Sequence, residues 1–283
     1  MKVLMPTTLD QALAALAELR ENAVPIAGGT DLLAHWPHRP PGDDRTFVDL
    51  SGLTELRACH WTADSLILGA LTSFGDVLET PRIQAEMPML IEAARSIGAV
   101  QIQSRATWVG NIANASPAAD GVLALIALDA TIELASSGGI THIPLDVFYT
   151  GYKQTRRRSD QLITAVHIPR CERTIESFIK VGTRRAQAIT KVGLAITRSD
   201  AGWRIVAGSM APTVTRCPTI EAMLASQVPI TSPADLHEAI CADLSPIDDI
   251  RSTAAYRTRV FANLLYHELA AHCSWVASSG GSA

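Results

Sequence analysis

Cysteine is scarce in this chain, and its few copies are scattered. The five cysteines stand too far apart for any two to share a local motif. Zinc sites, iron–sulfur clusters and redox dithiols use cysteines that recur within a few residues. The sequence therefore excludes such local sites and predicts reduced thiols, in the core or on the surface, at Cys59, Cys171, Cys217, Cys241 and Cys273.

Excess positive charge and long apolar runs are also missing. The chain has 24 Lys and Arg residues against 28 Asp and Glu, a formal net charge of −4, whereas nucleic-acid binders need a concentrated basic surface. The longest apolar stretch, residues 122–128, is too short to cross a bilayer. Pro6 and Asp10 interrupt the amino end, where a secretory signal needs an apolar segment. These absences predict a cytoplasmic protein without nucleic-acid binding or membrane insertion.

Several nucleotide-binding and hydrolase motifs are absent too. No two glycines stand at positions i and i+2, so there is no G-x-G-x-x-G fingerprint, and neither G-K-S/T nor G-x-S-x-G occurs. The only basic run is Arg156-Arg157-Arg158, which precedes Ser159 and Asp160. It predicts a solvated loop, with a docking patch for an acidic partner as the alternative.

What the chain does have is two glycine-bearing segments. The first, residues 26–31, reads Ile-Ala-Gly-Gly-Thr-Asp, with β-leaning residues before it and helix-leaning residues after it. Gly28 and Gly29 are expected at a strand-to-helix turn, where unpaired N–H groups and the helix dipole favour an anion. Glycine permits a phosphate to approach the main chain closely and permits a positive φ.

The second segment, residues 107–117, reads Thr-Trp-Val-Gly-Asn-Ile-Ala-Asn-Ala-Ser-Pro. Hydrogen-bonding side chains crowd here and just beyond, at Asn111, Asn114, Ser116 and Asp120, which suits a sugar or ribityl chain. Either segment alone favours an ordinary turn or a helix cap. Together they predict a ligand with both phosphates and hydroxyls.

In this order and at this separation, the two segments resemble the flavin-binding signatures of the FAD subunit of the molybdenum hydroxylases. This family includes xanthine dehydrogenase and carbon monoxide dehydrogenase. The resemblance covers nearly the whole chain and extends to residues 6–13, 143–145, 168–169, 178–185 and 255–257. It implies a flavoprotein subunit of an oxidoreductase.

The length of 283 residues, 47% of them hydrophobic, allows a sizeable core and two or three modules. We predict an α+β fold with a two-lobed FAD-binding domain. Its small βαβ-like N-terminal lobe spans residues 1–58, and a larger lobe with a mixed or antiparallel sheet spans residues 59–171. Residues 172–283 are predicted to form a small C-terminal α+β domain with a three-stranded antiparallel sheet and helices.

The pattern of apolar residues and turn signals places the individual elements. Strands are expected at residues 24–27, 46–50, 66–70, 131–135, 140–145, 162–168, 175–181, 188–198 and 203–209. Helices are expected at residues 87–97, 118–128, 219–225, 234–244 and 252–271. Thr8 and Gln11 have the form of a capping box for the first helix, and Thr72 or Ser73 is expected to cap a short one. Residues 38–44 read as a polar loop and residues 278–283 as a disordered tail.

The resemblance implies cofactor-binding residues but no catalytic acid, base or nucleophile. The pyrophosphate and ribityl chain would be held by Pro25, Ile26, Ala27, Gly28, Gly29, Thr30, Asp31 and Leu32, and from the second segment by Thr107, Gly110, Asn111, Asn114 and Ser116. Asp120 would accept a hydrogen bond from the ribityl hydroxyls. As an alternative, Asp120 is an acid favoured at a helix N-terminus, and both roles are compatible.

Four further residues are implied around the rings of the cofactor. Lys180 would lie near the polar edge of the flavin, where a cation stabilises the negative charge of the reduced ring. Ile163 or its neighbour Leu162 would pack on the isoalloxazine face, and Ile97 near the adenine. On the residues alone, Lys180 is an exposed strand lysine and the three aliphatic residues belong to the core.

The chain departs from the family pattern at two places. Val109 replaces the first glycine of the second signature, and Trp108 replaces the aliphatic residue before it. Gln103 stands where the family commonly has an arginine, with Arg105 two residues later. Thr30 occupies the position where covalent flavin enzymes of a related fold often have histidine, so FAD is expected to bind non-covalently.

The resemblance further implies a complex that dimerises and contains two other subunits, a large molybdopterin-binding subunit and a small subunit with 2Fe–2S clusters. Electrons would pass from those clusters to FAD in this chain and then to a soluble acceptor, NAD or another. Two alternatives stay open: a stand-alone FAD-dependent oxidoreductase and a cofactor-free scaffold subunit. The substrate pocket would lie in another subunit, so purines, other N-heterocycles, aldehydes and carbon monoxide are all compatible with this sequence.

Overall fold

The computed structural model describes residues 2–36 and 44–276. Its internal contacts divide the chain into two compact units, Met1–Ala115 with Asp129–Arg170, and Ser116–Leu128 with Cys171–Ala283. The predicted loop at residues 38–44 falls almost wholly outside the described residues, and the predicted tail at 278–283 falls wholly outside them. The division into three modules at residues 58 and 171 stays a prediction.

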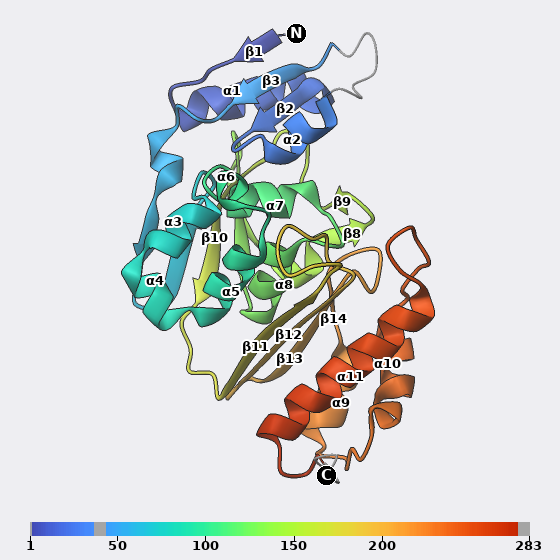
Figure 1. The fold of residues 1–283 in the computed structure, drawn as a ribbon. Helices are drawn as coiled ribbons and strands as arrows, with labels where there is room; N and C mark the ends of the chain where they lie inside the picture. The colour runs from blue at the N-terminus through green and yellow to red at the C-terminus, as the bar shows by residue number, and fades with distance from the viewer. Residues whose placement is uncertain (1, 37–43, 277–283) are drawn as a thin grey trace. The chain divides into compact units, whose positions relative to one another are not determined.

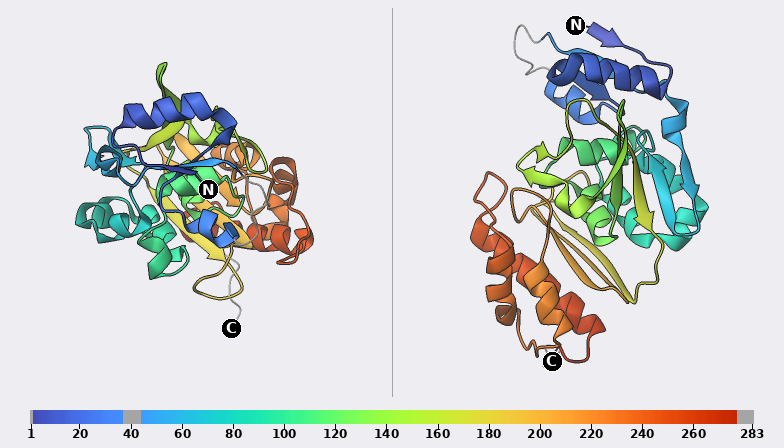
Figure 2. Two further views of the ribbon diagram at one scale, coloured as in Figure 1. Left: turned by 90° about the horizontal axis from the view of Figure 1, so that it is seen from above. Right: turned by 180° about the vertical axis from the view of Figure 1, so that it is seen from behind.

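A small parallel sheet begins the first unit. Its strands, in the spatial order β1, β3, β2, are Lys2–Leu4 (β1), Ala23–Ile26 (β2) and Thr46–Asp49 (β3). Helix α1 (Leu9–Leu19) and the 3-10 turn η1 (Arg20–Asn22) connect β1 to β2, and helix α2 (Thr30–His35) follows β2. Figure 2 shows α1 running alongside this sheet in the view from behind. The predicted βαβ-like lobe is therefore confirmed.

The start of α1 differs in detail from the predicted capping box. The Thr8 hydroxyl accepts a hydrogen bond from the Gln11 N–H at 3.3 Å, as expected. The Gln11 side chain, however, accepts from the N–H of Thr7 at 2.9 Å and not from that of Thr8. The reciprocal bond thus closes one residue earlier than the motif predicts.

A five-stranded antiparallel sheet forms the larger part of the first unit. In spatial order its strands are Cys59–Trp61 (β4), Ser65–Gly69 (β5), Leu162–Pro169 (β10), Thr131–Ser136 (β6) and Gly139–Pro144 (β7). On β6, Ile132 and Leu134 are fully buried while Glu133 between them is not. This alternation means that one face of the sheet packs on the core while the other is more open.

Short helices and turns complete the first unit. They are Thr54–Arg57 (η3), Phe74–Glu79 (α3), Pro81–Glu86 (α4), Pro88–Ser96 (α5), Val100–Gln103 (α6), Trp108–Asn114 (α7) and Leu145–Val147 (η4), with a hairpin of Tyr149–Gly151 (β8) and Gln154–Thr155 (β9). Ser73, one of the two predicted caps, forms a capping box with Asp76 at the start of α3. Among the described residues, no helix combines the length and the apolar character that a membrane span requires.

The second unit is built on an antiparallel sheet between helices. The sheet contains Ile175–Val181 (β11), Val192–Ser199 (β12), Gly202–Gly208 (β13) and Thr215–Arg216 (β14). Its helices are Asp120–Ala127 (α8), Pro218–Ala225 (α9), Pro233–Leu236 (η5), His237–Asp243 (α10) and Ala254–His272 (α11). The three predicted strands are present, and the two-residue β14 extends them at one edge.

The helices of this unit cover both faces of the sheet. Leu194 and Ile196 of β12 join the core that includes residues of α9, α10 and α11, and Figure 1 shows α10 and α11 side by side. On the other face, Gly193 and Gly208 lie against Leu123 of α8. Strand β12 begins at Val192, whereas a strand over residues 188–198 was expected. Just before it, the Thr190 hydroxyl donates a hydrogen bond to Asp120 Oδ1.

Candidate cofactor pocket

A cavity of about 560 Å³ lies within the first unit. Most small-molecule sites have volumes of about 300 to 1,000 Å³ and apolar walls with a few polar groups. This cavity fits that description, because most of its wall is apolar and its polar groups are concentrated in the two glycine-bearing segments. The lining comprises Val24, Pro25, Ile26, Ala27, Gly28, Gly29, Thr30, Asp31, Leu32, Ala34, Leu50, Ala70, Phe74, Ile97, Ile102, Ala106, Thr107, Val109, Gly110, Asn111, Ala113, Asn114, Arg157, Leu162 and Ile163.

The structure brings most of the predicted cofactor-binding residues together at this pocket. All of residues 25–32 line it, together with Ile97, Thr107, Gly110, Asn111, Asn114, Leu162 and Ile163. Ser116, Asp120 and Lys180 are not among its lining residues and belong to the second unit. The roles assigned to individual residues stay predictions.

The first glycine segment forms the predicted strand-to-helix turn. Gly29 is the N-cap residue of α2 and has a φ of 69°, in the left-handed region that glycine adopts without strain. No side chain caps the first turn of α2, so N–H groups of Thr30 and its neighbours are available to an anion. The turn therefore has the geometry of a phosphate cradle.

Gly28 is required by packing within the protein. A Cβ atom at this position would overlap the main-chain carbonyl of Arg105 and come within 3.1 Å of Ala106 Cα. From the sequence, both glycines were expected to permit the close approach of a phosphate. In the structure, Gly28 lets the first glycine segment lie directly against residues 105–106, which helps to close this end of the pocket.

The second glycine segment begins at the N-cap of α7 and contains the whole of that helix. Thr107 caps this helix, and its hydroxyl accepts a hydrogen bond from the Gly110 N–H at 2.9 Å. Trp108, which replaces an aliphatic residue of the family pattern, is fully buried with its ring centroid 4.5 Å from that of Phe74. Val109, which replaces a glycine, lines the pocket. The first substitution thus fills the core, and the second adds a side chain to the pocket wall.

Asp31 and Asn114 connect the two segments across the pocket. The Asn114 side-chain amide donates a hydrogen bond to Asp31 Oδ1 at 3.1 Å. His35 Nε2 lies 3.8 Å from the same oxygen. This contact joins α2 to α7 and so fixes the two glycine-bearing segments relative to each other.

Arg157 is a pocket residue that the sequence patterns did not predict. It was assigned with its neighbours to a solvated loop, and Arg156 and Arg158 are indeed exposed, but Arg157 is half-buried and lines the pocket. Its Nη1 donates to the carbonyl oxygens of Gln161 at 2.7 Å and Arg158 at 3.1 Å. Arg157 is the one Lys or Arg side chain in the described pocket lining. A run of three arginines gives no sign of which one points inward, so only the structure identifies it.

In the second unit, the predicted cofactor-binding residues Asp120 and Lys180 form a buried polar cluster with Thr190. Lys180 Nζ lies 2.6 Å from Asp120 Oδ2, and the Thr190 hydroxyl donates to Asp120 Oδ1 at 2.5 Å. Asp120 is only 6% exposed. Burial raises the pKa of Asp120, while the charge and hydrogen bond of Lys180 and the hydrogen bond of Thr190 oppose that rise. Both predicted residues, Asp120 and Lys180, are therefore paired with each other.

Comparison with known protein families gives a consistent result along the whole chain. Residues 1–171 match the FAD binding domain in molybdopterin dehydrogenase, and residues 177–271 match the C-terminal domain of the CO dehydrogenase flavoprotein. The chain is 31% identical over 269 residues to the xanthine dehydrogenase FAD-binding subunit of Escherichia coli O157:H7, covering 91% of this chain and 90% of that one. It is 27% identical over 274 residues to the carbon monoxide dehydrogenase medium chain of Hydrogenophaga pseudoflava, covering 93% and 94%.

Solved structures agree with these matches. Carbon monoxide dehydrogenase from Hydrogenophaga pseudoflava superposes with a TM-score of 0.85 at 25% identity and covers 98% of both chains. Quinoline 2-oxidoreductase from Pseudomonas putida 86 superposes equally well, with a TM-score of 0.85 at 21% identity over 96% of both chains, and bears on the fold alone. The fold is thus shared with chains of proteins that are named for different small molecules.

Proposed function

This chain belongs to the family of FAD-binding subunits of the molybdopterin dehydrogenases, and we propose that in such an enzyme it passes electrons from a partner subunit to a soluble acceptor. The observation that carries the proposal is the pocket, whose walls gather both predicted flavin signatures. When bound there, FAD supplies the electron-carrying chemistry. The residues of this chain bind and orient the cofactor.

The residues of the pocket fit FAD in type and position. The uncapped first turn of α2, entered through the left-handed Gly29, suits the diphosphate. Leu162 and Ile163, both almost fully buried, provide an apolar surface for a flat ring system. Arg157 places a cation in the wall, where it favours the negative charge that a flavin acquires on reduction. Thr30 offers no imidazole for a covalent link, so we infer non-covalent binding.

We further infer that the chain works in a complex with a large molybdopterin-binding subunit and a small subunit with 2Fe–2S clusters. The support is its similarity over 93% of its length to a protein named as a medium chain of carbon monoxide dehydrogenase. Relatives are also named for xanthine and nicotinate. Because this chain provides the flavin site, the choice of substrate belongs to the partner that carries the molybdenum centre.

Purification from the native cell, with an affinity tag on this chain, tests both parts of the proposal. The expected result is a complex that contains molybdenum, iron and FAD, with FAD released on denaturation. Candidate substrates such as xanthine, nicotinate, aldehydes or carbon monoxide are then added to identify one that bleaches the iron–sulfur absorbance. That substrate is expected to drive reduction of the soluble acceptor only when FAD is present.

A complex depleted of FAD is the informative control. It is expected to be reduced by substrate at its iron–sulfur clusters while its reduction of the soluble acceptor falls by about 100-fold or more, a loss of at least ~2.7 kcal/mol of transition-state stabilisation. Turnover by this chain alone would instead establish a stand-alone oxidoreductase. A colourless chain without releasable nucleotide would establish a scaffold subunit.

Replacing Arg157 by leucine tests the contribution of the pocket cation. Arg157→Leu is expected to weaken FAD binding by about tenfold or more, because hydrogen bonds to charged groups contribute roughly 1.5 to 3 kcal/mol. It should also make the reduction potential of the bound flavin more negative, since a cation favours the reduced ring. FAD titration and a redox titration measure the two effects. Arg158→Leu is the matched control, because Arg158 is exposed and paired with Asp160; an equal loss in both variants would remove Arg157 from the site.

A further inference from the structure

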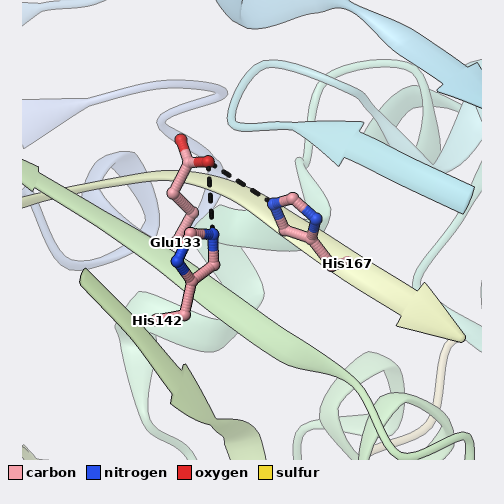
Figure 3. Close-up of side chains that lie close together, drawn as sticks. All are labelled: Glu133, His142 and His167. Atoms are coloured by element: carbon pink, nitrogen blue, oxygen red, sulfur yellow. Dashed lines mark ion pairs between the residues drawn. The ribbon is translucent and has the colours of Figure 1, made fainter. Parts of the chain in front are cut away.

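A cluster of two histidines and a glutamate lies on the five-stranded sheet, on three adjacent strands. Glu133 is on β6, His142 is its direct cross-strand partner on β7, and His167 is on β10. Figure 3 shows the three side chains pointing toward one another. Glu133 Oε2 lies 3.6 Å from His142 Nε2 and 3.5 Å from His167 Nε2. One carboxylate oxygen thus faces both imidazoles.

These distances are those of ligands around one metal ion. Zinc binds histidine nitrogen and carboxylate oxygen at about 2.0 to 2.2 Å, so two ligand atoms in a tetrahedral site stand roughly 3.3 to 3.5 Å apart. The three candidate ligand atoms here all lie within 4.8 Å of one another. Two imidazoles and a carboxylate form a donor set that suits zinc and its neighbours in the transition series and is unlike the all-oxygen sites of magnesium and calcium.

The Nε2 atom of His167 lacks a hydrogen-bond partner among the described residues. This atom is buried, and its distance of 3.5 Å from the carboxylate is that of an ion pair. Leaving a buried nitrogen unsatisfied costs about 1 to 3 kcal/mol. A metal ion would satisfy this nitrogen.

Thr164 holds the carboxylate in the orientation that the cluster needs. The pairing of β10 with β6 shifts between Ile163 and Ala165, so Thr164 is the extra residue of a β-bulge. Its hydroxyl lies 2.5 Å from Glu133 Oε1 and donates to it. This bond occupies one carboxylate oxygen and leaves Oε2 to the two histidines. Metal-binding carboxylates are commonly oriented by such a second hydrogen bond.

From this geometry we propose that Glu133, His142 and His167 bind a divalent transition metal ion, zinc first of all, through Glu133 Oε2 and the two Nε2 atoms. The ion would link three strands, including the edge strand β7, and three protein ligands leave a fourth position open. The His142 side chain is 49% exposed, so that position faces solvent or a partner's side chain. The site is separate from the cofactor pocket, whose lining includes none of these residues.

Zinc competition against a chromophoric chelator, with the full-length FAD-loaded protein first stripped by EDTA, tests the site. The wild type is expected to bind one equivalent of zinc. The substitutions Glu133→Gln, His142→Asn and His167→Asn should each lower the affinity for that zinc ion by more than tenfold. Thr164→Val is expected to weaken it by about 10 to 100-fold, the range for residues that orient a ligand. Cobalt in place of zinc should give the intense visible bands of a four-coordinate site in the wild type and not in the Glu133, His142 and His167 variants.

Two controls keep the outcome decisive. His272→Asn changes an exposed histidine of α11, and a His237→Asn/Cys241→Ser double variant removes the surface pair in which Cys241 Sγ lies 3.6 Å from His237 Nε2. Both should bind zinc as the wild type does, and unchanged melting temperature and FAD content establish that all variants are folded. Wild-type affinity in Glu133→Gln and His142→Asn, or loss of the equivalent in the His237/Cys241 variant, would overturn the assignment.

Discussion

Gly29→Val is expected to remove FAD from the pocket while the chain stays folded. Gly29 has a φ of 69°, where a β-branched residue is strongly disfavoured, so the turn into α2 must change its conformation. A Cβ atom here meets nothing closer than 3.6 Å, so the change reorients the N–H groups without forcing the core apart. We expect FAD affinity to fall by at least 100-fold, which corresponds to about 2.7 kcal/mol. The FAD to protein ratio after denaturation measures it.

Gly139→Val is the matched control for that experiment. Gly139, the first residue of β7, also has a positive φ, 115°, and a Cβ atom there has no neighbour within 4 Å. The control therefore carries backbone strain of the same kind in the same unit, at a residue that does not line the pocket. Full FAD content in Gly29→Val, or an equal loss in Gly139→Val, would contradict the cradle at residues 26–31.

Lys180→Met is expected to give the largest loss of stability, and the loss should grow with pH. The variant leaves the Asp120 carboxylate buried without its cation. Removing one partner of a buried ion pair costs about 3 to 5 kcal/mol, and we expect about 3 because the Lys180 side chain is 14% exposed. Urea unfolding measured across a pH series gives the free energy of unfolding directly.

The direction of the pH dependence follows from the pKa of Asp120. Burial raises this pKa above its unfolded value of about 3.9, and Lys180 limits the rise. A carboxyl group with a raised folded-state pKa stabilises the fold at low pH, and that contribution is lost as pH rises toward the folded-state pKa. Without Lys180 the folded-state pKa is higher, so the loss continues to higher pH. The difference in the free energy of unfolding between Lys180→Met and the wild type should thus be small near pH ~4 and largest above neutrality.

A second substitution, at Asp120 itself, completes the test. In Lys180→Met/Asp120→Asn the titrating group is absent, and the Thr190 hydroxyl, which donates to the carboxylate in the wild type, can still donate to the amide oxygen of the introduced asparagine. The double variant should recover stability relative to Lys180→Met at neutral pH and lose the added pH dependence. If the single and double variants have the same pH profile, Asp120 is not the group responsible.

The elements of the fold were largely predictable because local patterns and burial agree. Strand β10 at Leu162–Pro169 was predicted at residues 162–168, and α8 at Asp120–Ala127 was predicted at residues 118–128. Both have apolar residues bounded by turn or cap residues. The predicted start of β12 at residue 188 was wrong. Residues 188–191 have the composition of a strand, but the chain is irregular there and the Thr190 hydroxyl donates a hydrogen bond to Asp120. A tertiary hydrogen bond overrides the local preference at that point.

The parts of the sites that escaped prediction depend on contacts between distant residues. The need for Gly28 arises from the Arg105 carbonyl, which no local motif reveals. Arg157 is distinguished from its neighbours only by the direction in which its side chain points. The cluster of Glu133, His142 and His167 is assembled by strand pairing and a bulge, so its sequence spacing matches no metal motif. Sequence patterns locate the glycine turns, whereas these features depend on contacts between residues that are distant in the sequence.

The way the chain passes through α8 has a consequence for dissecting the protein. Residues 116–128 leave the flavin-binding unit, pack on β12 and β13, and then return. A fragment that ended at residue 171 would retain α8, all eight of whose residues are buried in the intact chain, but would have lost the sheet that covers it. Exposed apolar surface of that kind leads to aggregation. A single truncation therefore cannot isolate the flavin-binding unit. A functional split protein would require that both fragments be expressed together.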